Sequence, residues 1–221
     1  MKILNAFLVG LFIWGGSTSF CQTAVSICES NSSFAIDDAR KILKTFQPST
    51  VDLSERRCIA KSIDLLAASK NHSDIPLLVP YLGFERPPGE NDMPHFSFHL
   101  RIPAITYPAI GALALQGDPA NELVSLEIEG TDTTQLQRQN AVITLLIIGH
   151  GHPELVLGRL LQRRKAVDAA IQKRIDDAIE FGLKSDDCKY SNGKCEDAVK
   201  SVRTGDRALN VYSQGDLLPQ V

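Results

Sequence analysis

Tyr107-Pro-Ala-Ile-Gly-Ala-Leu-Ala-Leu-Gln-Gly-Asp-Pro119 and, 33 residues further on, Asn140-Ala-Val-Ile-Thr-Leu-Leu-Ile-Ile-Gly-His-Gly-His-Pro153 are the two stretches that decide the fold. Each contains an apolar run of helical length, a glycine that ends it and a proline that suits the first turn of a new helix. The sequence therefore predicts two successive helix-turn-helix units.

The most apolar helix is expected at 135–148, where Ala141 to Ile148 has almost no polar face. A helix that is apolar on all sides is a buried one. We therefore expect this helix at the centre of the core, between neighbouring helical pairs.

Helices are also expected on both sides of these units. Asp118-Pro119 favours a helix over 119–129, although Val124 to Glu129 also alternates as a strand does. Pro80 should kink a helix through Leu77 and Tyr81. The charged outer face of 165–183 is typical of the last, capping helix of a stacked array. The other expected helices cover 36–46, 53–69, 103–116, 154–161 and 196–203.

The helical pattern fails between Gly83 and Ile102, a stretch rich in proline. A long loop inside a compact domain is often functional. Its last part, 96–102, alternates apolar and polar residues, so a short strand is possible there.

A repeat connects Ile63, Ile110 and Ile143, which hold matching places before their turns at intervals of 47 and 33 residues. Helical pairs that recur at such spacing indicate an α-solenoid. Over 53–183 the chain resembles the HEAT-repeat family, on Ala109 to Pro119 and Ala141 to Pro153. The resemblance implies an all-α superhelix, here of about three helical pairs with a C-terminal capping helix, that presents a curved face to another protein and catalyses no reaction.

The N-terminus has the layout of a secretory signal peptide: Lys2, an apolar run to Trp14, then small polar residues. We expect cleavage after Ser19 or Cys21, and a lipid anchor on Cys21 is the lesser alternative. No later stretch is apolar enough to span a membrane. The expected divisions are a signal peptide (1–21), an N-terminal segment with the first helix (22–52), the helical array (53–184, with the insertion 83–102) and a disulfide hairpin with a tail (185–221).

Four cysteines remain after the leader: Cys28, Cys58, Cys188 and Cys195. An even number in an exported chain indicates disulfides, and four allow three pairings. Proximity, and the turn-forming Asn192-Gly193 pair, favour Cys188 with Cys195, which leaves Cys28 for Cys58. The spacing does not fit a zinc site. We therefore expect a secreted or periplasmic protein.

Charge and motifs argue against several functions. Without the leader the chain has 22 basic and 26 acidic residues, a net charge of −4, which gives no reason to expect a nucleic-acid partner. No nucleophile elbow or phosphate-binding loop occurs. We therefore expect neither enzymatic activity nor a cofactor.

Two histidine pairs, His95 with His99 and His150 with His152, are the candidates for a metal site. No acidic residue stands at a spacing that completes either set. The expectation is accordingly no specific metal site.

Aromatic and arginine residues around the insertion are the best candidates for binding, because these residue types anchor protein interfaces. The competing interpretation is that the phenylalanines fill one end of the core. We expect a non-enzymatic protein–protein interaction scaffold, and the alternative is a secreted ligand- or metal-binding module that uses 83–102. The candidate partner-binding residues are Phe84, Arg86, Phe96, Phe98, Arg101 and Tyr107.

Overall fold

The computed structural model describes residues 25, 26, 28, 34–88, 102–149 and 151–204, and every regular element in these ranges is helical. The expected all-helical class is therefore confirmed. The signal peptide, the insertion residues 89–101 and the tail from 205 lie outside the described ranges. No helix in the described part of the chain is long and apolar enough to cross a membrane.

The first two helices are α2 (Ile36–Thr45) and α3 (Leu53–Ser69), which pack against each other. Asp52 caps α3, where its side chain accepts a hydrogen bond from the Glu55 amide. Two further contacts hold this part of the chain: the Cys28–Cys58 disulfide joins the segment before α2 to α3, and Arg40, in the middle of α2, donates two hydrogen bonds to the Asp74 carboxylate.

The segment after α3 is broken into short pieces: η1 (His72–Asp74), α4 (Ile75–Leu78) and η2 (Val79–Tyr81). Pro80 has no amide proton to donate, so the α-helix ends before it and a 3-10 turn follows. The predicted kink is thus a change of helix type.

Instead of the predicted continuous helix over 103–116, the structure has α5 (Ile102–Thr106) and α6 (Pro108–Gln116). The break is at Tyr107, because a residue before proline is disfavoured in the helical region. Ile102, the last residue of the proposed strand, begins α5. The rest of that strand lies outside the described residues.

The prediction of a helix, and not a strand, after Asp118-Pro119 is confirmed. A 3-10 turn, η4 (Asp118–Ala120), leads into α7 (Asn121–Glu129). Val124 and Ile128 of α7 are buried, which is the four-residue spacing of a helix face and not the alternation of a strand.

The apolar helix is α8 (Gln135–Ile148), started by a capping box between Thr134 and Gln137. Leu145 and Leu146 are buried in the core, as expected. Ile143 and Ile147 are only partly buried, so the expectation of burial on all sides was too strong. One stripe of α8 reaches the surface.

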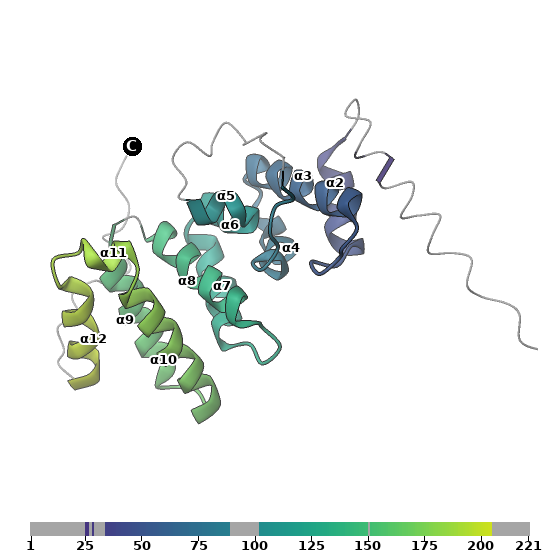
Figure 1. Cartoon of the computed structure of the whole chain (residues 1–221). Helices are drawn as coiled ribbons and strands as arrows, with labels where there is room; N and C mark the ends of the chain where they lie inside the picture. The colour runs from purple at the N-terminus through teal and green to yellow at the C-terminus, as the bar shows by residue number, and fades with distance from the viewer. Residues whose placement is uncertain (1–24, 27, 29–33, 89–101, 150, 205–221) are drawn as a thin grey trace, which may run out of the picture.

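The helices that carry the three matched isoleucines pack in sequence. Ile63 lies on α3, Ile110 on α6 and Ile143 on α8, and α3 packs against α6 while α6 packs against α8 (Figure 1). Ile63 and Ile110 are fully buried between these helices. α7 packs against η2 and against α8.

The C-terminal part contains α9 (Pro153–Arg164), α10 (Ala169–Leu183), α11 (Asp186–Lys189) and α12 (Lys194–Thr204). The helix predicted to cap the array, α10, packs against α7, α8 and α9, and α12, which was predicted to follow it, packs against α9. Asp168, expected on the outer face, caps α10 instead.

Candidate interaction surface

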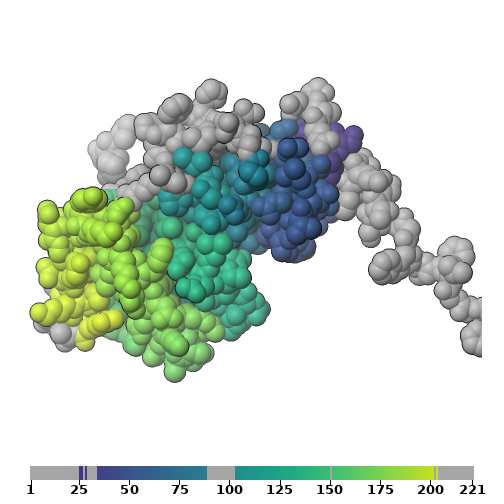
Figure 2. Space-filling view, viewed as in Figure 1, coloured from purple at the N-terminus to yellow at the C-terminus, as the bar shows by residue number. Residues whose placement is uncertain are grey.

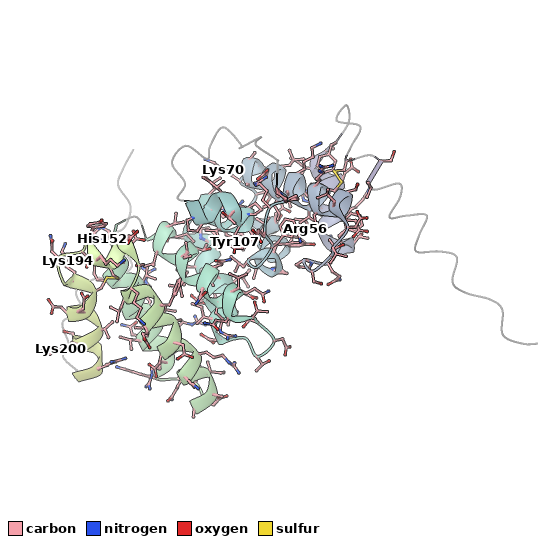
Figure 3. All side chains as sticks on the ribbon, in the orientation of Figure 1. Arg56, Lys70, Tyr107, His152, Lys194 and Lys200 are labelled. Carbon is pink, nitrogen blue, oxygen red and sulfur yellow. A yellow bond between two sulfur atoms is a disulfide. The ribbon has the colours of Figure 1, made fainter. Side chains whose placement is uncertain are left out.

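Phe84, predicted to bind a partner, is only 1% exposed. Its ring packs edge to face with Tyr81, and the guanidinium of Arg56 lies 5.2 Å from the ring centroid (Figure 3 labels Arg56). Phe84 therefore fills the core, as the competing interpretation held, and its assignment as an interface anchor was wrong.

Arg86 is likewise occupied inside the protein. Its guanidinium donates two hydrogen bonds of 2.8 Å to the Asp64 carboxylate, and its backbone amide donates to the Thr106 carbonyl. The side chain also donates to the carbonyl of Ile105. Arg86 thus joins α3 to the end of α5 and has a structural role, and its role in partner binding stays a prediction.

Asp64 is partly buried, and burial disfavours the charged form of its carboxyl. Burial raises the pKa of Asp64, and the hydrogen bonds from Arg86 only partly offset this effect. The ion pair therefore acts as a structural clamp.

Tyr107 remains half-buried at the start of α6. The other three predicted partner-binding residues, Phe96, Phe98 and Arg101, lie outside the described residues. The structure therefore does not bring the six candidates together as one surface.

Of the four paired histidines, only His152 is among the described residues, and its Nδ1 lies 3.2 Å from a Glu154 carboxylate oxygen at the start of α9. His95, His99 and His150 lie outside the described residues. In the parts of the chain that the structure describes, no group of three or more histidine, cysteine or acidic side chains could hold a metal ion.

Both predicted disulfides are present. Cys28 is bonded to Cys58 across 30 residues and Cys188 to Cys195 across 7. The second disulfide joins α11 to α12, and Asn192 and Gly193 both have positive φ in the turn between them. The predicted turn is confirmed, and helices flank it.

The feature that sequence reasoning missed is the end of the α7–α8 hairpin, residues 126–136, which we call the hairpin tip. Leu126 is 42% exposed and Leu136 is 39% exposed. Each lies within about one helical turn of the connection, so both are about 6 Å or less along a helix axis from the end of the hairpin. Both leucines therefore flank the connection between α7 and α8.

Glu127, beside Leu126, is half-buried, and the structure gives it no ion pair or hydrogen bond with another described residue. Burial raises the pKa of its carboxyl. An uncompensated carboxylate next to exposed leucines costs free energy that a cation on a partner could offset.

The hairpin tip is held rigidly. Thr133 donates a hydrogen bond to the Gly130 carbonyl within the connection, and Arg174 of α10 donates to the Glu129 carbonyl at the end of α7. On the α8 side, Asn140 donates to the carbonyl of Leu82 at the end of the η2 turn. Because the tip is already ordered, binding would cost little conformational entropy.

The molecular surface is hollowed beside this hairpin. Figure 2 shows an indentation in the outline between the N-terminal part, from α2 to α4, and the part that contains α7 and the α7–α8 connection. The connection projects on one side of this hollow in Figure 1.

Leu126 gave little signal in the sequence because it occurs in Val124 to Glu129, which alternates and is equally compatible with a buried strand face. Leu136 lies one turn from the apolar run of α8 and looks like part of it. Once α7 is known to be helical, however, Leu126 falls opposite the buried Val124 and Ile128, which would have predicted its exposure.

Comparison of the chain with protein-family models, with curated proteins and with solved structures finds no match.

Proposed function

We propose that this chain is a short HEAT-like helical array that binds another protein. The proposal is supported by the order in which α3, α6 and α8 pack, since these helices carry the matched isoleucines of the sequence repeat. Packing between elements that are close in the chain is what a stacked array requires. The array would comprise the pairs that begin with α3, α6 and α8, followed by the helices from α10 onwards.

The proposed location is outside the cytoplasm, in the periplasm or secreted. The two disulfides support it, because such bonds persist in oxidising compartments. The leader-like pattern of the first 21 residues agrees with export.

The proposed function is that of a non-enzymatic scaffold, and one observation supports it most strongly. The hairpin tip leaves Leu126 42% exposed and Leu136 39% exposed on an ordered support. Aliphatic side chains exposed together on an ordered surface are typical of protein interaction sites. The unpaired Glu127 suggests that the partner supplies a lysine or arginine there.

The ligand-binding alternative receives no support from the described end of the insertion. Phe84 and Arg86 are both used inside the protein, and residues 89–101 lie outside the described ranges. We therefore propose only the scaffold.

The test is site-specific photo-crosslinking in the native host. A photoreactive p-benzoylphenylalanine would replace Leu126 in one variant and Leu136 in another, with a matched control at the exposed Lys44 on α2. The proposal predicts the same discrete adduct from both tip positions and none from the control. If all three positions give the same pattern, or none gives an adduct, the hairpin tip is not the partner-binding surface.

A further inference from the structure

The connection between α11 and α12 contains the one Asn-Gly pair of the sequence, Asn192-Gly193. Both residues are exposed, and Lys194, the next residue, lies at the edge of the molecule (Figure 3). Asparagine is among the chemically least durable residue types, because the backbone nitrogen that follows it can attack its side-chain amide. The pair is therefore a candidate site of covalent modification.

The two groups that would react are both unengaged. Among the described residues, the Asn192 side chain has no hydrogen-bond partner and the Gly193 amide donates to no carbonyl. A Cβ placed on Gly193 would meet nothing within 4 Å, so no neighbouring group shields this residue. The Asn192 side chain can therefore approach the Gly193 nitrogen.

The turn that holds the pair is closed by one backbone hydrogen bond, 3.3 Å long, from the Lys194 amide to the Ser191 carbonyl. Asn192 and Gly193 have φ of 55° and 82°, which are typical of the central positions of a tight turn. Because this bond is slightly longer than normal and lies in an exposed loop, breaking it costs little. Local opening can therefore bring the two groups together while the helices remain folded.

The other three asparagines in the described ranges are held in place and provide internal comparisons. None of them precedes a glycine. Each uses its side-chain amide in a hydrogen bond: Asn71 with Ser73, Asn121 with Asp118, and the buried Asn140 with the Leu82 carbonyl. Among the described asparagines, Asn192 alone combines a free side chain with a following glycine.

We propose that Asn192 is a site of deamidation, at which the Gly193 nitrogen attacks the amide carbon of the Asn192 side chain. The new N–C bond closes a succinimide ring, the bond from that carbon to the side-chain nitrogen breaks, and ammonia leaves with the proton of the backbone nitrogen. Water then opens the ring at either carbonyl: its hydroxyl stays on the carbon, and its other hydrogen returns to the nitrogen.

The products are aspartate, or isoaspartate in which the backbone runs through the former side-chain carboxyl carbon. Each carries a new carboxylate, and isoaspartate also lengthens the backbone between Ser191 and Lys194 by a methylene group. The turn hydrogen bond between these two residues therefore cannot keep its geometry in the isoaspartate form. The modification needs no partner, so it is independent of the proposed function.

The experiment incubates the purified protein, with both disulfides intact, in neutral and in mildly alkaline buffer made with water enriched in heavy oxygen. Trypsin then releases the peptide 190–194, which contains Asn192 and no cysteine, for mass spectrometry. The inference predicts loss of the amide, uptake of solvent oxygen and labelling by an isoaspartyl methyltransferase. The rate should rise with pH, because the attacking nitrogen must lose its proton.

The rate at Asn192 should exceed the rate at Asn71, which is also exposed, by at least about tenfold, or about 1.4 kcal/mol in activation free energy. The matched variant is Asn192→Gly, because glycine adopts the positive φ of this position and has no amide to lose. Its peptide 190–194 should not be labelled by the methyltransferase. Asn192→Asp supplies the aspartate product as a standard of mass and charge.

The inference is overturned if the peptide 190–194 of the folded protein stays unchanged, if Asn192 reacts no faster than Asn71, or if methyltransferase labelling of this peptide persists in Asn192→Gly. A parallel incubation in urea separates local opening from global unfolding. Modification that is confined to the unfolded chain would also overturn the inference, because the folded turn would then keep the two groups apart.

Discussion

The segment from Tyr81 to Arg86 has the residue types expected at an interface but uses them inside the protein, whereas the hairpin tip has leucines that remain partly exposed. In the first segment, the ring of Phe84 meets Tyr81 and Arg56, and Arg86 meets Asp64. At the tip, Leu126 and Leu136 remain in contact with solvent and Glu127 lacks a paired cation among the described residues.

The difference shows that residue type alone does not identify an interface. Phenylalanine and arginine are enriched at binding hot spots, but they also satisfy each other inside a fold. What distinguishes a binding surface is a side chain for which the fold supplies no partner. The predictions below test this distinction by comparing the two regions.

The largest loss of stability is expected from Phe84→Ala. Removing a fully buried aromatic side chain leaves a cavity, and it should lower the free energy of unfolding by about 3 to 5 kcal/mol. Urea denaturation of the mature chain measures the loss. A decrease below about 1 kcal/mol would mean that Phe84 is not in the core.

A pH effect is expected at Tyr81, whose hydroxyl donates hydrogen bonds to the carbonyls of Leu43 and Phe46. Burial raises the pKa of Tyr81 to about 12 from the ordinary value of 10.0. Since the folded state favours the neutral phenol, the resulting stability is present below pH 10 and is lost as the pH rises towards 12.

The difference in stability between wild type and Tyr81→Phe should therefore shrink across this alkaline range, by up to about 3 kcal/mol. Denaturation at a series of pH values measures it, with phenolate absorbance as a second signal. A constant difference across the range would contradict the burial of the hydroxyl.

Asp64→Ala should cost about 2 kcal/mol, because the variant leaves the largely buried guanidinium of Arg86 without its two charge-assisted hydrogen bonds. The matched control is Glu180→Ala, which removes an ion pair with Lys184 that is mostly exposed. Thermal denaturation of both variants should show a clearly larger loss for Asp64→Ala. Equal losses would indicate that the clamp is solvated.

The smallest effect on stability is expected for Leu126→Ala combined with Leu136→Ala. Both side chains are partly exposed, so the double variant should lose less than about 1 kcal/mol. Urea denaturation under the conditions used for Phe84→Ala makes the comparison direct. A loss as large as that of Phe84→Ala would place the tip in the core.

Much of the fold was predictable from local signals. Capping residues near the starts of α3 and α8 were recognisable, with Asp52 or Ser54 for α3 and Thr133 or Thr134 for α8, and the structure has Asp52 and Thr134 as the caps. The matched isoleucines lie on helices that pack in sequence. Caps and apolar periods act over a few residues, so the sequence contains them directly. The disulfide pairing followed from proximity for the same reason.

Which residues of the candidate interaction surface are exposed could not be predicted from such local signals. Whether Phe84 faces Arg56 or solvent depends on contacts between residues far apart in the chain, and its amino-acid type is the same in both cases. The position of α10 inside the C-terminal part also depended on α12, a helix whose packing against α9 has no signal in the sequence of α10. Such tertiary contacts decide which apolar face remains exposed.

The central claim is that this chain binds a protein partner through the hairpin tip, and its most direct test is the dissociation constant of the partner captured there. Calorimetry would compare the wild type with the Leu126→Ala, Leu136→Ala double variant, which retains the fold. The account predicts affinity at least about tenfold weaker for the double variant, the loss expected of interface hot spots. Equal affinities for the two proteins would contradict it.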